Sequence, residues 1–160
     1  MPHPQRTPEE LATAVARYRD ATDAVLALVD SLDEAALDRT PPQPGGWTPR
    51  MVVHHLADSE ANAYVRLRRL LAEPAGTVVQ GYDEARWARA LHYDRPVASS
   101  RAVLAAVRAA SAELLDTLTP ADLSRAGVHT ESGPYSLADW LDIYTAHPHD
   151  HAEQIRAALA

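Results

Sequence analysis

The chain has 160 residues, 46% of them hydrophobic and 23% charged, and we expect residues 1–160 to form a single folded domain. A formal net charge of −7 without a basic tract argues against a nucleic-acid partner. No apolar run reaches the roughly 18 residues that cross a bilayer, and the N-terminus lacks a signal-peptide pattern, so we expect a cytoplasmic protein without a membrane partner. The absence of cysteine leaves histidine and oxygen atoms as the available metal ligands.

The first predicted element is a helix of about 25 residues. Thr7 is a suitable N-cap, Pro8 favours the first helical position, and Glu10 completes a capping box. Apolar residues then recur at three-, four- and seven-residue steps, which is the stripe of an amphipathic helix. These residues are Leu11, Val15, Tyr18, Val25, Val29 and Leu32.

A second helix is predicted over about 48–73. It follows a stretch rich in proline and glycine and restarts at Thr48-Pro49, with the same cap-plus-proline chemistry as the first helix. Pro74 and Gly76 end it. A connection of roughly twenty residues follows, in which a short helix is expected around 83–91.

The alanine- and leucine-rich segment 98–118 predicts a third helix, and Thr119-Pro120 predicts a short helical turn after it. Residues 127–134 are expected to form a loop. Ser136 and Asp139 resemble a capping box, with aspartate in the glutamate position, at the start of a fourth helix that extends almost to the C-terminus.

Four amphipathic helices of this length, with no strand-rich region, predict an all-α four-helix bundle. The connection between the second and third helices is long enough to cross over the bundle, so a simple up-down-up-down order is not required.

The most informative polar pair is His147 and His151. At i and i+4 their imidazoles share one helix face, and two such nitrogens can bind one metal ion at about 2.1 Å. A third ligand has to come from elsewhere, and the second helix offers His54 and His55. His149 lies about 200° around the helix from His147 and is left out of the site.

The remaining histidines are expected to be surface or hydrogen-bonded groups rather than ligands. These are His3, His54, His92 and His129. Two polar helix faces support His55, His147 and His151 as the ligands instead. His55, Asp58, Asn62 and Arg66 align along the second helix, and Trp140, Tyr144, His147, His151 and Gln154 share a face of the fourth. The two large aromatic residues in the second set predict that this face points inward.

Three segments together resemble the DinB/YfiT-like superfamily of metal-binding four-helix bundles, which includes the bacillithiol and mycothiol S-transferases, and its YfiT branch in particular. They read GGWTPRMVVHHLADSEANAYVRLRRLLAE, GYDEARWARAL and GPYSLADWLDIYTAHPHDHAEQI. The resemblance implies that His55, His147 and His151 bind a divalent metal, zinc or nickel. It also implies a bundle with a crossover connection, often assembled as a homodimer.

One departure concerns Pro148, which directly follows His147 inside the fourth helix. Proline lacks an N–H and clashes with the carbonyl four residues earlier, so we expect a kink that disturbs the geometry of His147. The carbonyl of Tyr144 would then need another partner.

Three functions are compatible with such a site and a small-molecule substrate. In the first, the metal binds a low-molecular-weight thiol as thiolate and directs it at an electrophile, with Asn62, Arg66, Tyr144 and Trp140 as substrate-binding candidates. In the second, the metal activates water for hydrolysis, and Asp58 or Glu60 acts as the catalytic base. In the third, the protein binds a metal or small ligand without catalysis.

Overall fold

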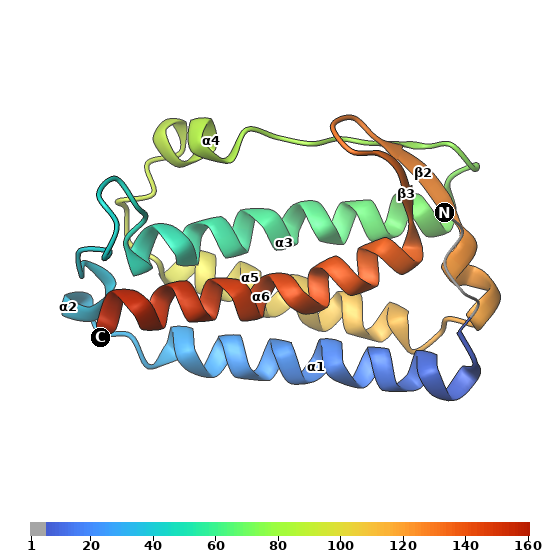
Figure 1. Cartoon of the computed structure of the whole chain (residues 1–160), viewed down its shortest axis with the longest axis horizontal. Helices are drawn as coiled ribbons and strands as arrows, with labels where there is room; N and C mark the ends of the chain where they lie inside the picture. The colour runs from blue at the N-terminus through green and yellow to red at the C-terminus, as the bar shows by residue number, and fades with distance from the viewer. Residues whose placement is uncertain (1–5) are drawn as a thin grey trace.

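The computed structural model describes residues 6–160, so His3 lies outside the described residues. Four long helices form the predicted four-helix bundle: α1 (Pro8–Asp30), α3 (Pro49–Ala72), α5 (Ala98–Leu115) and α6 (Leu137–Leu159). Each lies between two neighbours: α1 packs on α5 and α6, and α3 also packs on α5 and α6 (Figure 1). None of the helices within 6–160 combines the length and apolarity of a bilayer-spanning segment.

The predicted crossover is present. The chain between α3 and α5 runs back along the length of the bundle, so α3 and α5 point in the same direction (Figure 1). This connection contains the predicted short helix, α4 (Glu84–Ala90). A further short helix, α2 (Glu34–Leu37), follows α1, and a 3-10 turn, η1 (Pro120–Ser124), follows α5.

The helix starts follow the capping chemistry predicted from the sequence. Thr7 accepts a hydrogen bond from the N–H of Glu10, whose carboxylate accepts from the N–H of Thr7 in return. Ser136 and Asp139 form the same reciprocal pair at the start of α6. These caps satisfy backbone groups that a helix end otherwise leaves without partners.

The predicted loop at 127–134 is wrong. Strands β2 (Ala126–His129) and β3 (Gly133–Ser136) form an antiparallel hairpin, and β1 (Val78–Val79) pairs parallel with β2. Gly127 permits this pairing, because a Cβ at that position would lie 2.4 Å from the carbonyl oxygen of Thr77. The sheet lies beside one end of the bundle, next to the start of α6 (Figure 1).

Helix α6 runs without interruption from Leu137 to Leu159 although it contains Pro148, and the expectation that the carbonyl of Tyr144 needs another partner is confirmed. The side chain of Pro148 is buried. The carbonyl of Tyr144, four residues earlier, accepts a hydrogen bond of 3.1 Å from Nη1 of Arg108 on α5. A side chain from a neighbouring helix thus replaces the N–H that proline lacks.

Two apolar clusters form the core, one at each end of the bundle. One contains Tyr18, Leu67 and Trp140, and the other contains Val29 and Leu56. On every long helix the residues between the clusters include a polar side chain. These are Thr22 on α1, Glu60 on α3, Arg108 on α5, and His147 and His151 on α6, and His55 lies at the edge of this layer, among the residues of the second cluster. The middle of the bundle is therefore a polar layer between two apolar ones.

Candidate metal centre

Three imidazoles meet in the polar layer. Nε2 of His147 lies 3.3 Å from Nε2 of His55 and 3.1 Å from Nε2 of His151. One nitrogen of each ring lies within 4.8 Å of the others. Among residues 6–160, these three side chains are the cluster whose ligand atoms lie close enough together to hold a metal ion. The structure therefore brings together the three histidines that the sequence singled out.

The spacing of these nitrogens fits a bound metal ion. Two ligands about 2.1 Å from an ion lie about 3.4 Å apart in tetrahedral geometry and about 3.0 Å apart in cis octahedral positions. Burial and the charge of His151 lower the pKa of both His55 and His147 to about 3, so both rings are neutral at pH 7, as metal ligands must be.

The opposite ring nitrogens differ in their surroundings: that of His151 has a hydrogen-bond partner, whereas Nδ1 of His55 and of His147 are buried without one among the described residues. Nδ1 of His151 donates to Oε1 of Gln154 at 2.8 Å, which leaves its Nε2 lone pair facing the other two rings. Nδ1 of His147 lies 4.0 Å from Oε1 of Glu60. The His55 ring packs against Trp47, with centroids 4.9 Å apart.

A buried ion pair lies on the Nδ1 side of His147, 4.0 Å from that nitrogen. Glu60 and Arg108 are 1% and 0% exposed, and Nη1 of Arg108 donates to Oε1 of Glu60 at 2.7 Å. Arg108 also donates to the hydroxyl of Thr22 and the carbonyls of Tyr18 and Tyr144. Burial raises the pKa of Glu60 to about 7, although Arg108 opposes the rise. Four helices are thus linked through one guanidinium next to the histidines.

The two candidate bases differ in their surroundings. Glu60 is occupied by Arg108, on the Nδ1 side of His147. Asp58 is partly exposed and accepts a 2.6 Å hydrogen bond from the hydroxyl of Tyr93, in the crossover connection. Its backbone carbonyl accepts from Asn62, so that amide is engaged within α3.

The substrate-binding candidates separate into two groups. Arg66 donates to the hydroxyl of Tyr144 at 2.7 Å, and the Tyr144 ring lies 6.2 Å from that of His147, so Tyr144 adjoins the histidines and connects them to Arg66. Trp140 is fully buried in the core, and its ring N–H donates to the carbonyl of Ala63. The structure therefore places Trp140 away from any ligand, although the inward direction of this face of α6 is confirmed.

The other histidines within the described residues lie apart from the centre. His54 is fully buried, with its ring nitrogens 2.7 Å from the hydroxyl of Ser100 and 2.9 Å from the carbonyl oxygen of Arg95. His129 accepts from two backbone N–H groups of the hairpin turn. His92 and His149 are exposed. The expectation that His54, His92 and His129 are hydrogen-bonded or surface groups is confirmed.

Three residues around the centre were not predicted from the sequence: Trp47, Tyr93 and Arg108. Arg108 could have been found, because it lies in step with the buried positions of α5, between Leu104 and Leu115. A charged residue in a buried stripe indicates a paired internal group. Trp47 and Tyr93 lie in connections, where no periodic pattern indicates burial.

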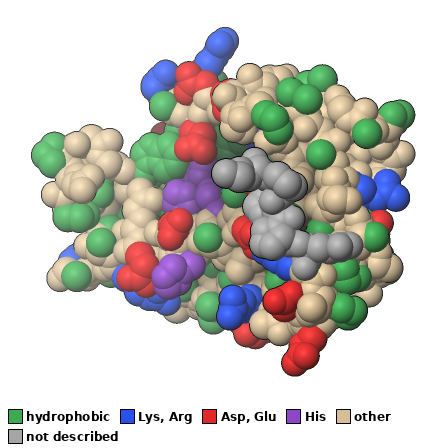
Figure 2. All heavy atoms as spheres, turned by 45° about the vertical axis from the view of Figure 1, so that its right-hand side comes forward, with side chains coloured by type: hydrophobic (Ala, Val, Ile, Leu, Met, Phe, Trp, Pro, Cys, Tyr) green, Lys and Arg blue, Asp and Glu red, His purple; other side chains and the backbone are tan. Residues whose placement is uncertain are grey.

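The three-histidine site is partly open to solvent. Figure 2 shows one face of the molecule, on which histidine side chains lie in a recess bordered by hydrophobic and acidic side chains, with basic side chains scattered around. His147 keeps 20% of its side-chain surface exposed. The three-histidine site is therefore reachable from outside rather than sealed in the core.

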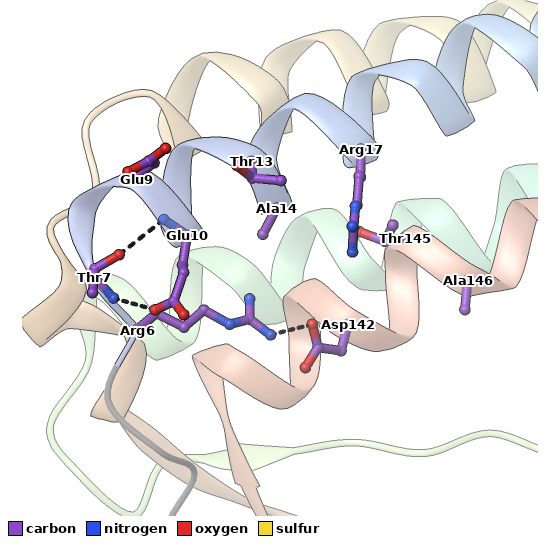
Figure 3. Close-up of a pocket in the computed structure, with 10 residues that line it drawn as sticks. All are labelled: Arg6, Thr7, Glu9, Glu10, Thr13, Ala14, Arg17, Asp142, Thr145 and Ala146. Atoms are coloured by element: carbon purple, nitrogen blue, oxygen red, sulfur yellow. Dashed lines mark hydrogen bonds and ion pairs between the residues drawn. The ribbon is translucent and has the colours of Figure 1, made fainter.

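A separate groove of about 870 Å³ lies between α1 and α6 (Figure 3). An ion pair between Arg6 and Asp142 crosses it, and Arg17 and Thr145 also line it. Asp142 and Thr145 lie roughly opposite His147 and His151 around α6. This groove is therefore on the other side of the helix from the three histidines.

Comparison with known proteins agrees with this geometry. The model of the DinB superfamily matches residues 17–155. A protein of Oceanobacillus iheyensis is 40% identical over 111 residues, which cover 69% of this chain and 64% of that protein. A protein of Bacillus mycoides is 34% identical over 149 residues, which cover 93% and 85%. Both are named "Putative metal-dependent hydrolase".

Two solved structures share the fold. YfiT from Bacillus subtilis, described as "a probable metal-dependent hydrolase with an unusual four-helix bundle topology", aligns with a TM-score of 0.85 and 29% identity, over 99% of this chain and 90% of YfiT. TT2238, described as a four-helix bundle protein, aligns with a TM-score of 0.64 and 26% identity, over 92% and 98%.

Proposed function

Because this chain belongs to the DinB superfamily, we propose that its three histidines bind a divalent metal ion, zinc or nickel, and make it an enzyme. The observation that carries the proposal is the convergence of three Nε2 atoms at 3.1 and 3.3 Å on a partly exposed site. Three protein ligands leave at least one metal position open, as catalytic sites do and closed structural sites do not.

The nucleophile that this site favours is a low-molecular-weight thiol. The bound ion would lower the pKa of a coordinated thiol or water molecule. A thiol activated in this way needs no further base, and neither carboxylate near the histidines is free: Glu60 is held by Arg108, and Asp58 by Tyr93. We therefore propose transfer of the thiol sulfur to an electrophilic carbon, with departure of a leaving group that takes its bonding electrons.

Hydrolysis is the second candidate, and two observations favour it. The relatives from Oceanobacillus iheyensis and Bacillus mycoides carry that name. Asp58 is three residues after His55 on α3, which puts both side chains on one helix face, and its carboxylate is partly exposed. Opening of its hydrogen bond to Tyr93 would free it to accept a proton from water.

A pair of assays separates these activities. Zinc- or nickel-loaded protein is mixed with a panel of bacterial thiols and 1-chloro-2,4-dinitrobenzene, and thioether formation is followed by absorbance. The first candidate is supported if S-transfer requires one particular thiol, is lost in His151→Ala and persists in His149→Ala. Turnover of ester or amide substrates without added thiol supports hydrolysis instead. Retention of metal without either activity indicates a non-catalytic metal-binding or ligand-binding protein.

A further inference from the structure

Within residues 6–160, the hydrogen bonds of the Arg66 guanidinium go to neutral oxygen atoms. Arg66 lies on α3, three turns beyond His55, which corresponds to about 16 Å along the helix axis. Among residues 6–160, its guanidinium makes no ion pair, whereas Arg50 and Arg108 each bind carboxylates. A guanidinium has five N–H groups and is charged at all relevant pH values, so such an arginine has unused capacity for an anion.

The partners of Arg66 are neutral oxygen atoms. Nη1 donates to the hydroxyl of Tyr144 at 2.7 Å, and Nη2 donates to the backbone carbonyl of Gln80 at 2.6 Å. Nε is buried and has no acceptor among the described residues. Neutral acceptors leave the positive charge uncompensated, and the N–H that remains is the one that a bidentate carboxylate uses together with an Nη group.

A second unsatisfied group lies close by. Tyr135, on β3, is 5% exposed, and its buried hydroxyl also has no hydrogen-bond partner among the described residues. Burial is the main reason why its pKa is raised, and Tyr144, Arg66 and Asp139 also act on it. Buried polar atoms of native proteins are rarely left without partners. Two such atoms around one uncompensated cation indicate the place of a ligand oxygen.

This cluster adjoins the metal centre through Tyr144. The Tyr144 hydroxyl contacts Arg66, while its ring lies 6.2 Å from that of His147 on the same helix. A ligand that reaches from the histidines along this side of α3 and α6 would meet Arg66 at its far end.

We propose that Arg66, Tyr135 and Tyr144 form a subsite for a carboxylate on the substrate or thiol that binds at the three histidines. The inference rests on the proposed function, since the metal site supplies the second point of attachment. It restricts the substrate class to elongated small molecules with a metal-binding or reactive group at one end and a carboxylate at the other. Two anchors of this kind fix both position and orientation.

The competing explanation is that Arg66 only fastens the crossover connection through Gln80. That contact uses one of its five N–H groups and leaves both unsatisfied atoms unexplained. The two explanations differ in their consequences. A fastening role predicts that loss of Arg66 weakens neutral and anionic ligands equally, whereas a carboxylate subsite predicts a selective loss.

The test uses cobalt(II)-loaded protein, whose visible absorbance reports thiol binding. It is titrated with 6-mercaptohexanoate and with its neutral counterpart 6-mercapto-1-hexanol. We expect wild type to bind the carboxylate about tenfold more tightly or better, which is the usual gain from a charge-assisted bond. The preference should disappear in Arg66→Gln, fall in Tyr135→Phe and persist in Arg68→Gln. Arg68 is a matched control that stacks on Tyr64.

Equal affinity for the two thiols in wild type, or an equal loss for both in Arg66→Gln, would overturn the subsite. Failure to bind cobalt would overturn the proposed function instead. The subsite is then still tested in chelator-treated protein, by the effect of hexanoate on the melting temperature at fixed ionic strength. A rise in wild type and Arg68→Gln but not in Arg66→Gln supports the subsite, and the same shift in all three variants rejects it.

Discussion

Nη1 of Arg108 donates a 3.1 Å hydrogen bond to the backbone carbonyl of Tyr144. This carbonyl belongs to the residue four positions before Pro148, so the α-helical N–H that would otherwise bind it does not exist. The same Nη1 binds Glu60 at 2.7 Å, and Glu60 lies 4.0 Å from Nδ1 of His147. Arg108 therefore maintains α6 where proline weakens it, at the turn that carries the proposed metal ligands.

Replacement of Arg108 should be strongly destabilising. In Arg108→Met, the Glu60 carboxylate and the Tyr144 carbonyl lose their partner inside the core, and breaking a buried pair from one side costs about 3–5 kcal/mol. We expect the free energy of unfolding, measured by urea denaturation, to fall by about that amount. The double variant Arg108→Met/Glu60→Gln should recover part of it, because no buried charge is left alone. A loss below about 1 kcal/mol in the single variant would contradict this role.

A double-mutant cycle isolates the contact between Arg108 and the Tyr144 carbonyl. Pro148→Ala restores the N–H at position 148, so the carbonyl no longer depends on the guanidinium. Arg108→Met should then cost about 1 kcal/mol less in the Pro148→Ala background than in wild type, which is the worth of one hydrogen bond. Strict additivity of the two substitutions would show that Arg108 does not replace the missing donor.

The sequence predicted the four long helices because each carries local information. Thr7, Thr48 and Ser136 provide caps, and apolar residues recur at helical spacing behind them. The β-hairpin was missed for the opposite reason. Its strands are four residues long, contain Gly127, Gly133 and Pro134, and owe their pairing to contacts with β1, which is distant in sequence. Segments of this kind resemble loops in composition.

The site was predictable only in part. The i,i+4 spacing placed His147 and His151 on one face, and the motif segments distinguished His55 from His54. The supporting contacts were not visible, because Trp47, Tyr93 and Arg108 come from other elements and meet the centre only after folding. The sequence also predicted that the Tyr144 carbonyl needs a new partner but not which one, because Arg108 lies on another helix.

Metal content tests the three ligands directly. Wild type is expected to hold one equivalent of zinc or nickel by elemental analysis after gel filtration, and His55→Ala, His147→Ala and His151→Ala should each lose most of it. Removal of one of three ligands opens the site and weakens binding by orders of magnitude. The control is His149→Ala, since His149 is exposed on the same helix. A full equivalent retained without His55 or His151 would disprove the centre as described.

Gln154 should tune the affinity for metal without binding it. Its Oε1 accepts from Nδ1 of His151 at 2.8 Å, which fixes the ring and directs Nε2 toward the other histidines. Loss of such a partner typically weakens metal binding 10- to 100-fold. We expect about a tenfold loss in Gln154→Ala, measured by competition with a chromogenic chelator. Gln154→Glu should retain affinity, and Glu153→Ala serves as the neighbouring control. An unchanged metal affinity in Gln154→Ala would show that metal binding by His151 does not depend on this hydrogen bond.

The stability of the metal-free protein should fall on acidification. The pKa values of His55 and His147 are lowered to about 3, against about 6.5 in an unfolded chain. Between these values the unfolded chain binds protons that the folded protein does not, so the free energy of unfolding decreases as the pH falls. Each imidazole contributes up to about 1.4 kcal/mol per pH unit. Glu60, whose pKa is raised to about 7, contributes with the opposite sign between about 4.5 and 7.

Glu60 therefore offsets about one histidine contribution above pH 4.5, whereas burial also lowers the pKa values of His54 and His129, which add to the dependence. Urea denaturation in the presence of chelator, from pH 7.5 to 4.5, should show the stability of wild type falling as the pH falls. His147→Gln removes one of the clustered imidazoles, so its slope should be smaller than that of wild type by up to about 1.4 kcal/mol per pH unit. His149→Gln should follow wild type, since that side chain is exposed. If His147→Gln keeps the wild-type slope, protonation of the clustered imidazoles is not what weakens the fold in acid.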